Sequence, residues 1–146
     1  MNPAIQRLMS VVAILAVCGI VVSSVSLQHH YAKSKTEFCD IGESFNCDIV
    51  NRSQYSEVLG IPVALIGMLG YGALAALATL YRQRRETPSL ILAGGVAGLG
   101  FALYLAYIEA RVLAIWCLLC LSSLALITLI AVAGSILWVK CRRIDL

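Results

Sequence analysis

Long uncharged, largely apolar stretches alternate along the chain with short segments that carry the charges. Four of these stretches are long enough to cross a membrane, at 8–27, 58–81, 87–108 and 112–139. A bilayer core about 30 Å thick needs roughly 20 helical residues, and a backbone in lipid must satisfy its own hydrogen bonds. The pattern predicts an all-α integral membrane protein: a four-transmembrane-helix bundle in a single domain, 1–146, with an outer loop at 28–57.

Composition supports a membrane protein and excludes several other classes. Of the 146 residues, 60% are hydrophobic and only 13% are charged, whereas ordinary soluble domains carry about 25% charged residues. The net charge of +3 comes from basic residues scattered between apolar blocks. We therefore expect membrane lipid as the surroundings and no nucleic acid as a partner.

The basic residues predict the orientation of the bundle. Seven of the eleven Lys and Arg residues fall on one side of the predicted spans: Arg7, Arg82, Arg84, Arg85, Lys140, Arg142 and Arg143. Cytoplasmic loops retain positive charge, so both termini are expected in the cytoplasm and 28–57 in the periplasm or a lumen. A removable signal peptide is disfavoured for 8–27, because the run is long for one and its loss would leave an odd number of spans.

Two cysteines three residues apart lie in the last span, in the segment Cys117-Leu118-Leu119-Cys120. This spacing places both sulfurs on one helical face, within reach of a disulfide. A thiolate is stabilised near a helix N-terminus. If the helix begins near Val112, Cys117 lies about 8 Å and Cys120 about 12 Å along it. One sulfur is then reachable from water and the other from lipid.

A second pair, Cys39 and Cys47, lies in the outer loop on the same side of the membrane. Two pairs within reach of one another favour a relay of thiol-disulfide exchange. A static loop disulfide in a non-catalytic four-span scaffold, with two packing cysteines in the last helix, stays open as an alternative. A zinc site is disfavoured because eight positions separate the loop cysteines and the other pair is embedded in lipid, so no metal is expected.

The order of motifs along the chain is Cys39-Asp40, Asn46-Cys47-Asp48, Ser53, the run from Gly60 to Ala64, and the pair at Cys117 and Cys120. In these residues the chain resembles bacterial homologues of vitamin K epoxide reductase. The resemblance implies four helices around a quinone, either ubiquinone or menaquinone, in a bacterial inner membrane. It also implies that Cys120 reacts with the quinone and that Cys117 is its partner.

The resemblance further implies a route for electrons from outside the membrane. Cys47 would exchange with Cys117, and Cys39 would accept electrons from a periplasmic thioredoxin-fold, DsbA-like protein acting in trans. Ser53 matches the family's loop serine or threonine near the reactive pair. The chain is thus expected to be a quinone-dependent, disulfide-generating thiol-disulfide oxidoreductase.

Departures from the vertebrate pattern bear on the substrate. Leu124 stands where the vertebrate enzymes carry a tyrosine, four residues after the second cysteine, and 58–81 contains no Asn or Gln to bond a quinone carbonyl. Reduction of vitamin K quinone or its epoxide is therefore the alternative rather than the first expectation. Tyr104 and Tyr107 in the third span are candidates to hold the quinone through a phenol.

Overall fold

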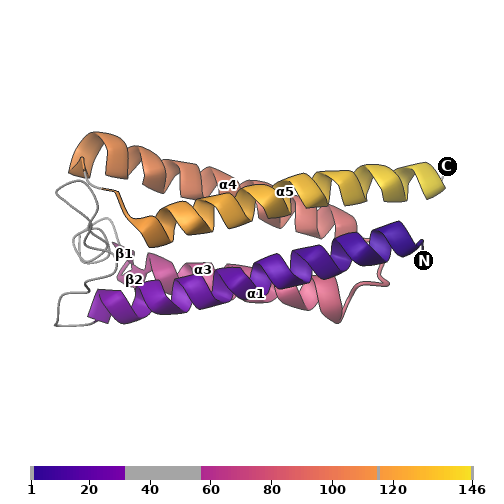
Figure 1. Cartoon of the computed structure of the whole chain (residues 1–146), viewed down its shortest axis with the longest axis horizontal. Coiled ribbons are helices and arrows are strands. Elements are labelled where there is room, and N and C mark those ends of the chain that lie inside the picture. The colour runs from indigo at the N-terminus through magenta and orange to yellow at the C-terminus, as the bar shows by residue number, and fades with distance from the viewer. Residues whose placement is uncertain (1, 32–56, 115, 146) are drawn as a thin grey trace.

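The computed structural model describes residues 2–31, 57–114 and 116–145, and in these residues it is a bundle of long helices (Figure 1). Its helices and strands, in chain order, are α1 (Pro3–Tyr31), β1 (Glu57–Val58), β2 (Ile61–Pro62), α3 (Val63–Thr79), α4 (Thr87–Ile108), the π-helical segment η3 (Glu109–Leu113) and α5 (Leu118–Asp145).

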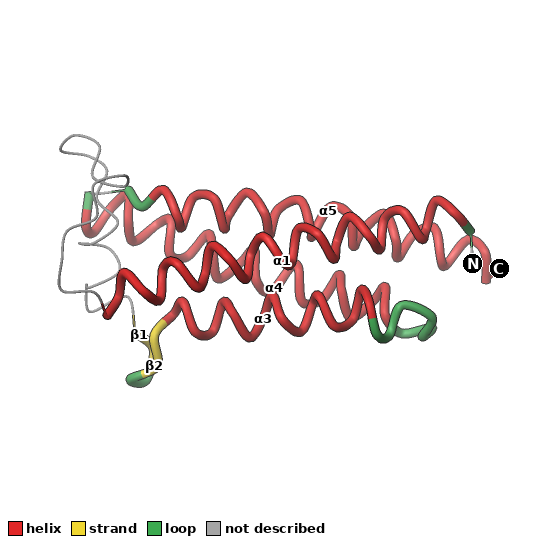
Figure 2. Tube along the Cα trace, turned by 60° about the horizontal axis from the view of Figure 1, so that its bottom comes forward, coloured by secondary structure: helices red, strands yellow, loops and turns green. Residues whose placement is uncertain are grey.

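Each helix packs against two others, which closes the bundle. α1 contacts α3 and α5, and α4 contacts α5 and α3. Both termini lie at one end of the bundle, and the β1–β2 hairpin lies at the other end with the last turns of α1 and the start of α5 (Figures 1 and 2). The end of α1 and the beginning of α5 are therefore on the same side, as the predicted spans require.

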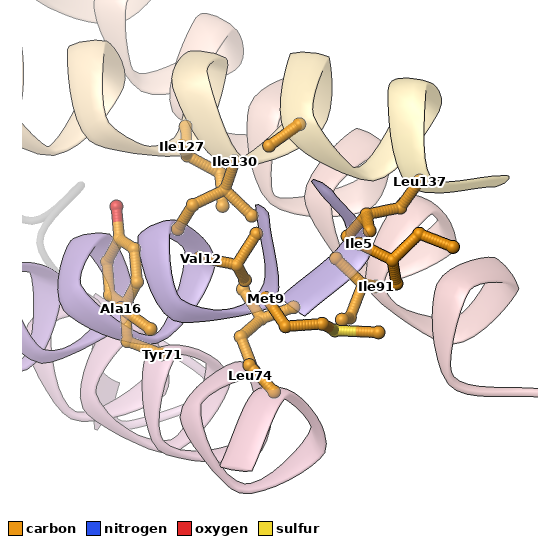
Figure 3. Packing of buried hydrophobic residues seen from close by; sticks show 12 residues of the cluster. Ile5, Met9, Val12, Ala16, Tyr71, Leu74, Ile91, Ile127, Ile130 and Leu137 are labelled. Carbon is orange, nitrogen blue, oxygen red and sulfur yellow. The ribbon is translucent and has the colours of Figure 1, made fainter. Parts of the chain in front are cut away.

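The bundle is apolar both inside and outside. Met9, Val12, Ile91, Ile130 and Leu137 are almost fully buried where the helices meet (Figure 3). Large apolar side chains are also exposed along every long helix, among them Val17, Leu69, Val96, Leu103 and Val132. A helix that is apolar all round belongs in lipid, so this outer surface is the one that faces a membrane.

Three helical stretches are long and apolar enough to span a bilayer: Pro3–Gln28, Thr87–Leu113 and Leu118–Ile144. α3 is also apolar but has only 17 residues, which is at the lower end of the usual range of about 17 to 25. Together with α3, these helices make the protein a multi-pass membrane protein with the predicted helical bundle.

Three helix starts differ from the predicted boundaries, the first being that of α1, which begins at Pro3 rather than at 8. α3 begins at Val63 rather than at 58, because Leu59 and Gly60 have positive φ angles of 56° and 80° and turn the chain into a hairpin before it. Such a two-residue turn matches the twist of paired strands. α5 begins at Leu118 rather than at Val112, because 109–113 continues α4 as the π-helical segment.

Close contact between α4 and α5 depends on glycine. A Cβ atom on Gly95 would lie 3.0 Å from the Cα atom of Ala131, and one on Gly134 would lie 3.1 Å from the Cα atom of Leu92. Small residues allow membrane helices to approach in this way. Other helix glycines, such as Gly70 in α3 and Gly100 in α4, have open space around them.

We expect Gly95→Ala to destabilise the bundle, because its methyl group would meet the backbone of α5 rather than a side chain that can move away. The expected loss is about 1–3 kcal/mol, measured by thermal unfolding in detergent. Gly100→Ala on the same helix is the matched control, because nothing lies within 4 Å of the added atom. Equal unfolding temperatures for the two variants would contradict the proposed helix contact.

Candidate active site

The site is built where α4 ends and α5 begins. The last turn of the α4 stretch is the π-helical segment η3, which begins with Glu109. It ends at Ala114, whose left-handed φ of 53° reverses the chain and whose N–H bonds to the Glu109 carbonyl oxygen. Short π-helical segments inside or at the end of α-helices frequently mark functional sites.

Cys117 caps the N-terminus of α5. Its carbonyl oxygen accepts a hydrogen bond from the Leu121 N–H at 3.0 Å, and its Sγ accepts one from the Cys120 N–H at 3.4 Å. A serine or threonine side chain fills the same role at many helix starts. The Cys120 N–H therefore holds the Cys117 side chain at the start of the helix.

The cap corrects the predicted depth of the two sulfurs. Cys117 does not lie inside the helix, as a start near Val112 would place it, but directly precedes its first residue. Cys120 lies in the first turn, about 4.5 Å further along the axis. The predicted order of the two residues along the helix is unchanged, and Cys117 is fully buried.

The thiol groups of Cys117 and Cys120 interact directly. Their side chains are joined by a hydrogen bond, which is the main reason why the pKa of Cys117 lies below its usual value, and the N–H groups of Cys120 and Leu119 shift the pKa in the same direction. Burial and the charge of Glu109 oppose the shift. A cysteine with a lowered pKa is the more reactive nucleophile of such a pair at neutral pH.

A buried carboxyl group ties the two helices together at this point. The Oε2 atom of Glu109 accepts a hydrogen bond from the Cys117 N–H at 3.1 Å, and only 2% of the Glu109 surface is exposed. The same side chain interacts with the Cys120 thiol. Its other oxygen, Oε1, is buried and has no hydrogen-bond partner among the described residues.

A cavity of about 460 Å³ opens beside these groups. Its walls are mainly apolar and come from all four long helices. They include Val22, Pro62, Ile66, Leu74, Phe101, Leu105, Leu113, Leu119 and Ile127. Polar atoms reach it from Glu109 and Cys120, and from Ser23, Ser26, Tyr71 and Ser123. Small-molecule sites have this size and this mixture of apolar walls with a few placed polar groups.

Tyr71 and Ser123 form the polar contact deeper in the cavity. The Tyr71 hydroxyl donates to the Ser123 carbonyl oxygen at 2.9 Å, and the two hydroxyl oxygens are 2.8 Å apart. Gly19 makes room for the tyrosine, since a Cβ atom there would overlap the ring. Ser123 is three residues after Cys120, so this contact lies about one helical turn below the cysteine.

The structure brings together some of the predicted site residues. Cys117 and Cys120 meet at the start of α5, and Cys120 lines the cavity. Tyr104 and Tyr107 do not line it, because their side chains are 56% and 63% exposed on the outer face of α4. The side of α4 and η3 toward the cavity carries Gly94, Gly98, Phe101, Leu105 and Glu109 instead.

Cys39, Cys47 and Ser53 lie outside the described residues. Within 2–31, 57–114 and 116–145 no cluster of three or more His, Cys, Asp or Glu side chains is arranged to hold a metal ion.

Three residues of the site were not predicted. Tyr71 and Ser123 carry no sequence signal, since a tyrosine or serine within an apolar stretch is common. Glu109 directly follows a predicted span, and together with Arg111 two residues later it indicated a charged connection outside the membrane. The structure instead buries it in the bundle, where ionisable residues are commonly functional.

Fold and site together define a multi-pass membrane protein with a thiol pair beside an apolar cavity. The chain matches the model of the vitamin K epoxide reductase family over residues 10–134, and it belongs to that family. Membership makes it a membrane oxidoreductase of a family that acts on quinones and vitamin K through cysteines.

Because the pKa of Cys117 is lowered, we expect its alkylation to persist to lower pH in the folded protein than in the unfolded chain. The rate should fall only when the pH drops through the lowered pKa, as the thiolate gains its proton. Mass spectrometry after alkylation over a pH series measures this midpoint for Cys117.

The Cys120 side chain is the main cause of the shift, so Cys120→Ala should move the midpoint of Cys117 to higher pH. Cys120→Ser is the matched control, because its hydroxyl can still donate a hydrogen bond to the sulfur. An unchanged midpoint in Cys120→Ala would show that the pair does not interact as described.

Proposed function

We propose that the protein is a quinone-dependent thiol-disulfide oxidoreductase that generates disulfides in a thioredoxin-fold partner. Electrons enter at Cys39 and Cys47, pass to Cys117 and Cys120, and leave to a quinone in the cavity. The observation that carries the proposal is the position of Cys120, which lines an apolar cavity within the bundle while its partner Cys117 caps the N-terminus of α5.

The cavity suits a quinone. A quinone ring with an apolar tail needs apolar walls, and its two carbonyl oxygens need hydrogen-bond donors. The Ser123 hydroxyl, held beside Tyr71 one turn below Cys120, can turn to donate one hydrogen bond, and Glu109 supplies a carboxyl group beside Cys120. Bound there, a quinone would supply a two-electron oxidant for the thiol pair.

The outer steps are thiol-disulfide exchange. A reduced thioredoxin-fold partner attacks the disulfide between Cys39 and Cys47 through a mixed disulfide at Cys39. Cys47, now a thiol, then exchanges with Cys117, which transfers two electrons to the inner pair. The lowered pKa of Cys117 supports this role, because thiolates carry out exchange. Ser53 is proposed to assist near the loop pair.

The orientation is proposed from the charges. Arg7, Arg82, Arg84, Arg85, Lys140, Arg142 and Arg143 belong to the segments at the end of the bundle where both termini lie (Figure 1). Arg82 Nη2 bonds there to the Gln6 carbonyl oxygen at 3.2 Å. By the positive-inside rule this end faces the cytoplasm. The end of the bundle with Cys117 and Cys120 then faces the periplasm, with the bundle in a bacterial inner membrane. Disulfides persist in the periplasm.

Cys120→Ala should abolish quinone reduction, because it removes the sulfur nearest the cavity, while leaving the helical content unchanged. The assay is reduction of a short-chain quinone by purified protein with a reduced thioredoxin-fold partner. Cys18→Ala is the control, since Cys18 is exposed on α1 and away from the cavity lining. Full turnover by Cys120→Ala would refute the proposed route.

The same assay separates the alternative functions. With Leu124 in place of the vertebrate tyrosine, we expect vitamin K epoxide to be a much poorer substrate than the quinone. Comparable turnover would favour a vitamin K quinone or epoxide reductase. Cysteines whose alkylation does not change with quinone supply in intact membranes would favour the structural scaffold.

A further inference from the structure

We propose that Glu109 is the proton-transfer group of the site: its carboxyl group takes the proton of the Cys120 thiol and delivers a proton to the electron acceptor in the cavity. This inference rests on the proposed function and adds to it the path of the proton.

The position of Glu109 is the first support. Among the described residues it is the one acidic side chain that lines the cavity. It also contacts both members of the thiol pair, through the Cys117 N–H at 3.1 Å and through the Cys120 thiol. A proton donor or acceptor has to touch the group whose proton it moves, and this carboxyl group does so.

The free oxygen of the carboxyl group is the second support. Oε1 is buried without a hydrogen-bond partner in the described part of the chain, and the residue is only 2% exposed. Buried polar atoms are nearly always paired, so an unpaired one calls for an explanation. An unpaired carboxyl oxygen, on a residue that lines the cavity, has a free position for the proton of the neighbouring Cys120 thiol.

A purely structural role does not account for a carboxyl group at this position. Holding the Cys117 N–H needs one acceptor oxygen, which the amide of a glutamine also offers. The negative charge of Glu109 even opposes formation of the Cys117 thiolate. What a carboxyl group can do here and an amide cannot is to take up and release a proton.

The proposed step balances. Cys117 begins as a thiolate and Cys120 as a thiol. A bond forms between the two sulfurs, the pair gives up two electrons to the quinone, and the Cys120 proton passes to Glu109. The quinol requires two protons at its oxygens, of which Glu109 delivers one and water supplies the other. The carboxyl group ends each turnover in the state in which it began.

Glu109→Gln tests the proposal, because it keeps the side-chain length and the acceptor for the Cys117 N–H but cannot carry a proton. We expect quinone reduction to slow by about 100-fold or more, as is typical when a general acid–base group is lost. Glu86→Gln is the matched control: Glu86 is an exposed carboxylate at the other end of α4 and its loss should leave the rate unchanged.

A second measurement needs no quinone. The reduced and diamide-oxidised proteins are compared by infrared difference spectroscopy. We expect a carboxyl C=O band that changes with oxidation of the pair, shifts in D₂O, and is missing in Glu109→Gln but kept in Glu86→Gln. Labelling glutamate with ¹³C at the side-chain carboxyl group should shift the same band in the unmodified protein, which makes the test independent of how well the variant folds.

Either of two results would overturn the inference: quinone reduction by Glu109→Gln at the wild-type rate, or no oxidation-linked glutamate band in the labelled protein. The proposed function is tested separately. If Cys120→Ala is inactive while Glu109→Gln is fully active, the electron route stands and the proton path is wrong. If Cys120→Ala is active, the electron route itself is wrong.

Discussion

The hydrogen bond from the Cys117 N–H to the Glu109 carboxylate connects the end of one membrane helix to the start of the next. It satisfies a backbone group that has no partner within α5 and that is buried from water. It also sets Cys117 in place to accept the Cys120 N–H at its sulfur. The position of Cys117 at the start of α5 is therefore tied to Glu109 at the end of the preceding helix.

The start of α5 explains why the two cysteines differ although they are only three residues apart. Cys117 is at the start of α5, where the N–H groups of the first turn point at its sulfur and favour the thiolate. Cys120 is one turn further in and lines the apolar cavity. At this helix start, Cys117 is therefore suited to exchange with other thiols, and Cys120 is suited to react with an apolar oxidant. The Tyr71–Ser123 contact adds polar groups one turn below.

Much of the fold follows from the sequence alone, but the site follows only in part. The apolar stretches predicted the helices, and the cysteine spacing predicted a pair on one helical face. The start of α5 was predicted six residues too early. No sequence pattern in 109–117 predicts a π-helical segment or the left-handed backbone of Ala114. α3 was predicted too long because the turn at Leu59 and Gly60 interrupts an uncharged stretch without a polar residue in the turn.

The sequence by itself determined that this is a helical membrane protein with a thiol pair near one end of its last helix, since length and absence of charge are sufficient for that. Only the tertiary structure decided that Tyr104 and Tyr107 face outward and that Glu109 faces inward. The physical reason is that lipid is as apolar as a protein core. Hydrophobic periodicity, which distinguishes the buried face of a helix in water, carries little information about which faces meet in a membrane.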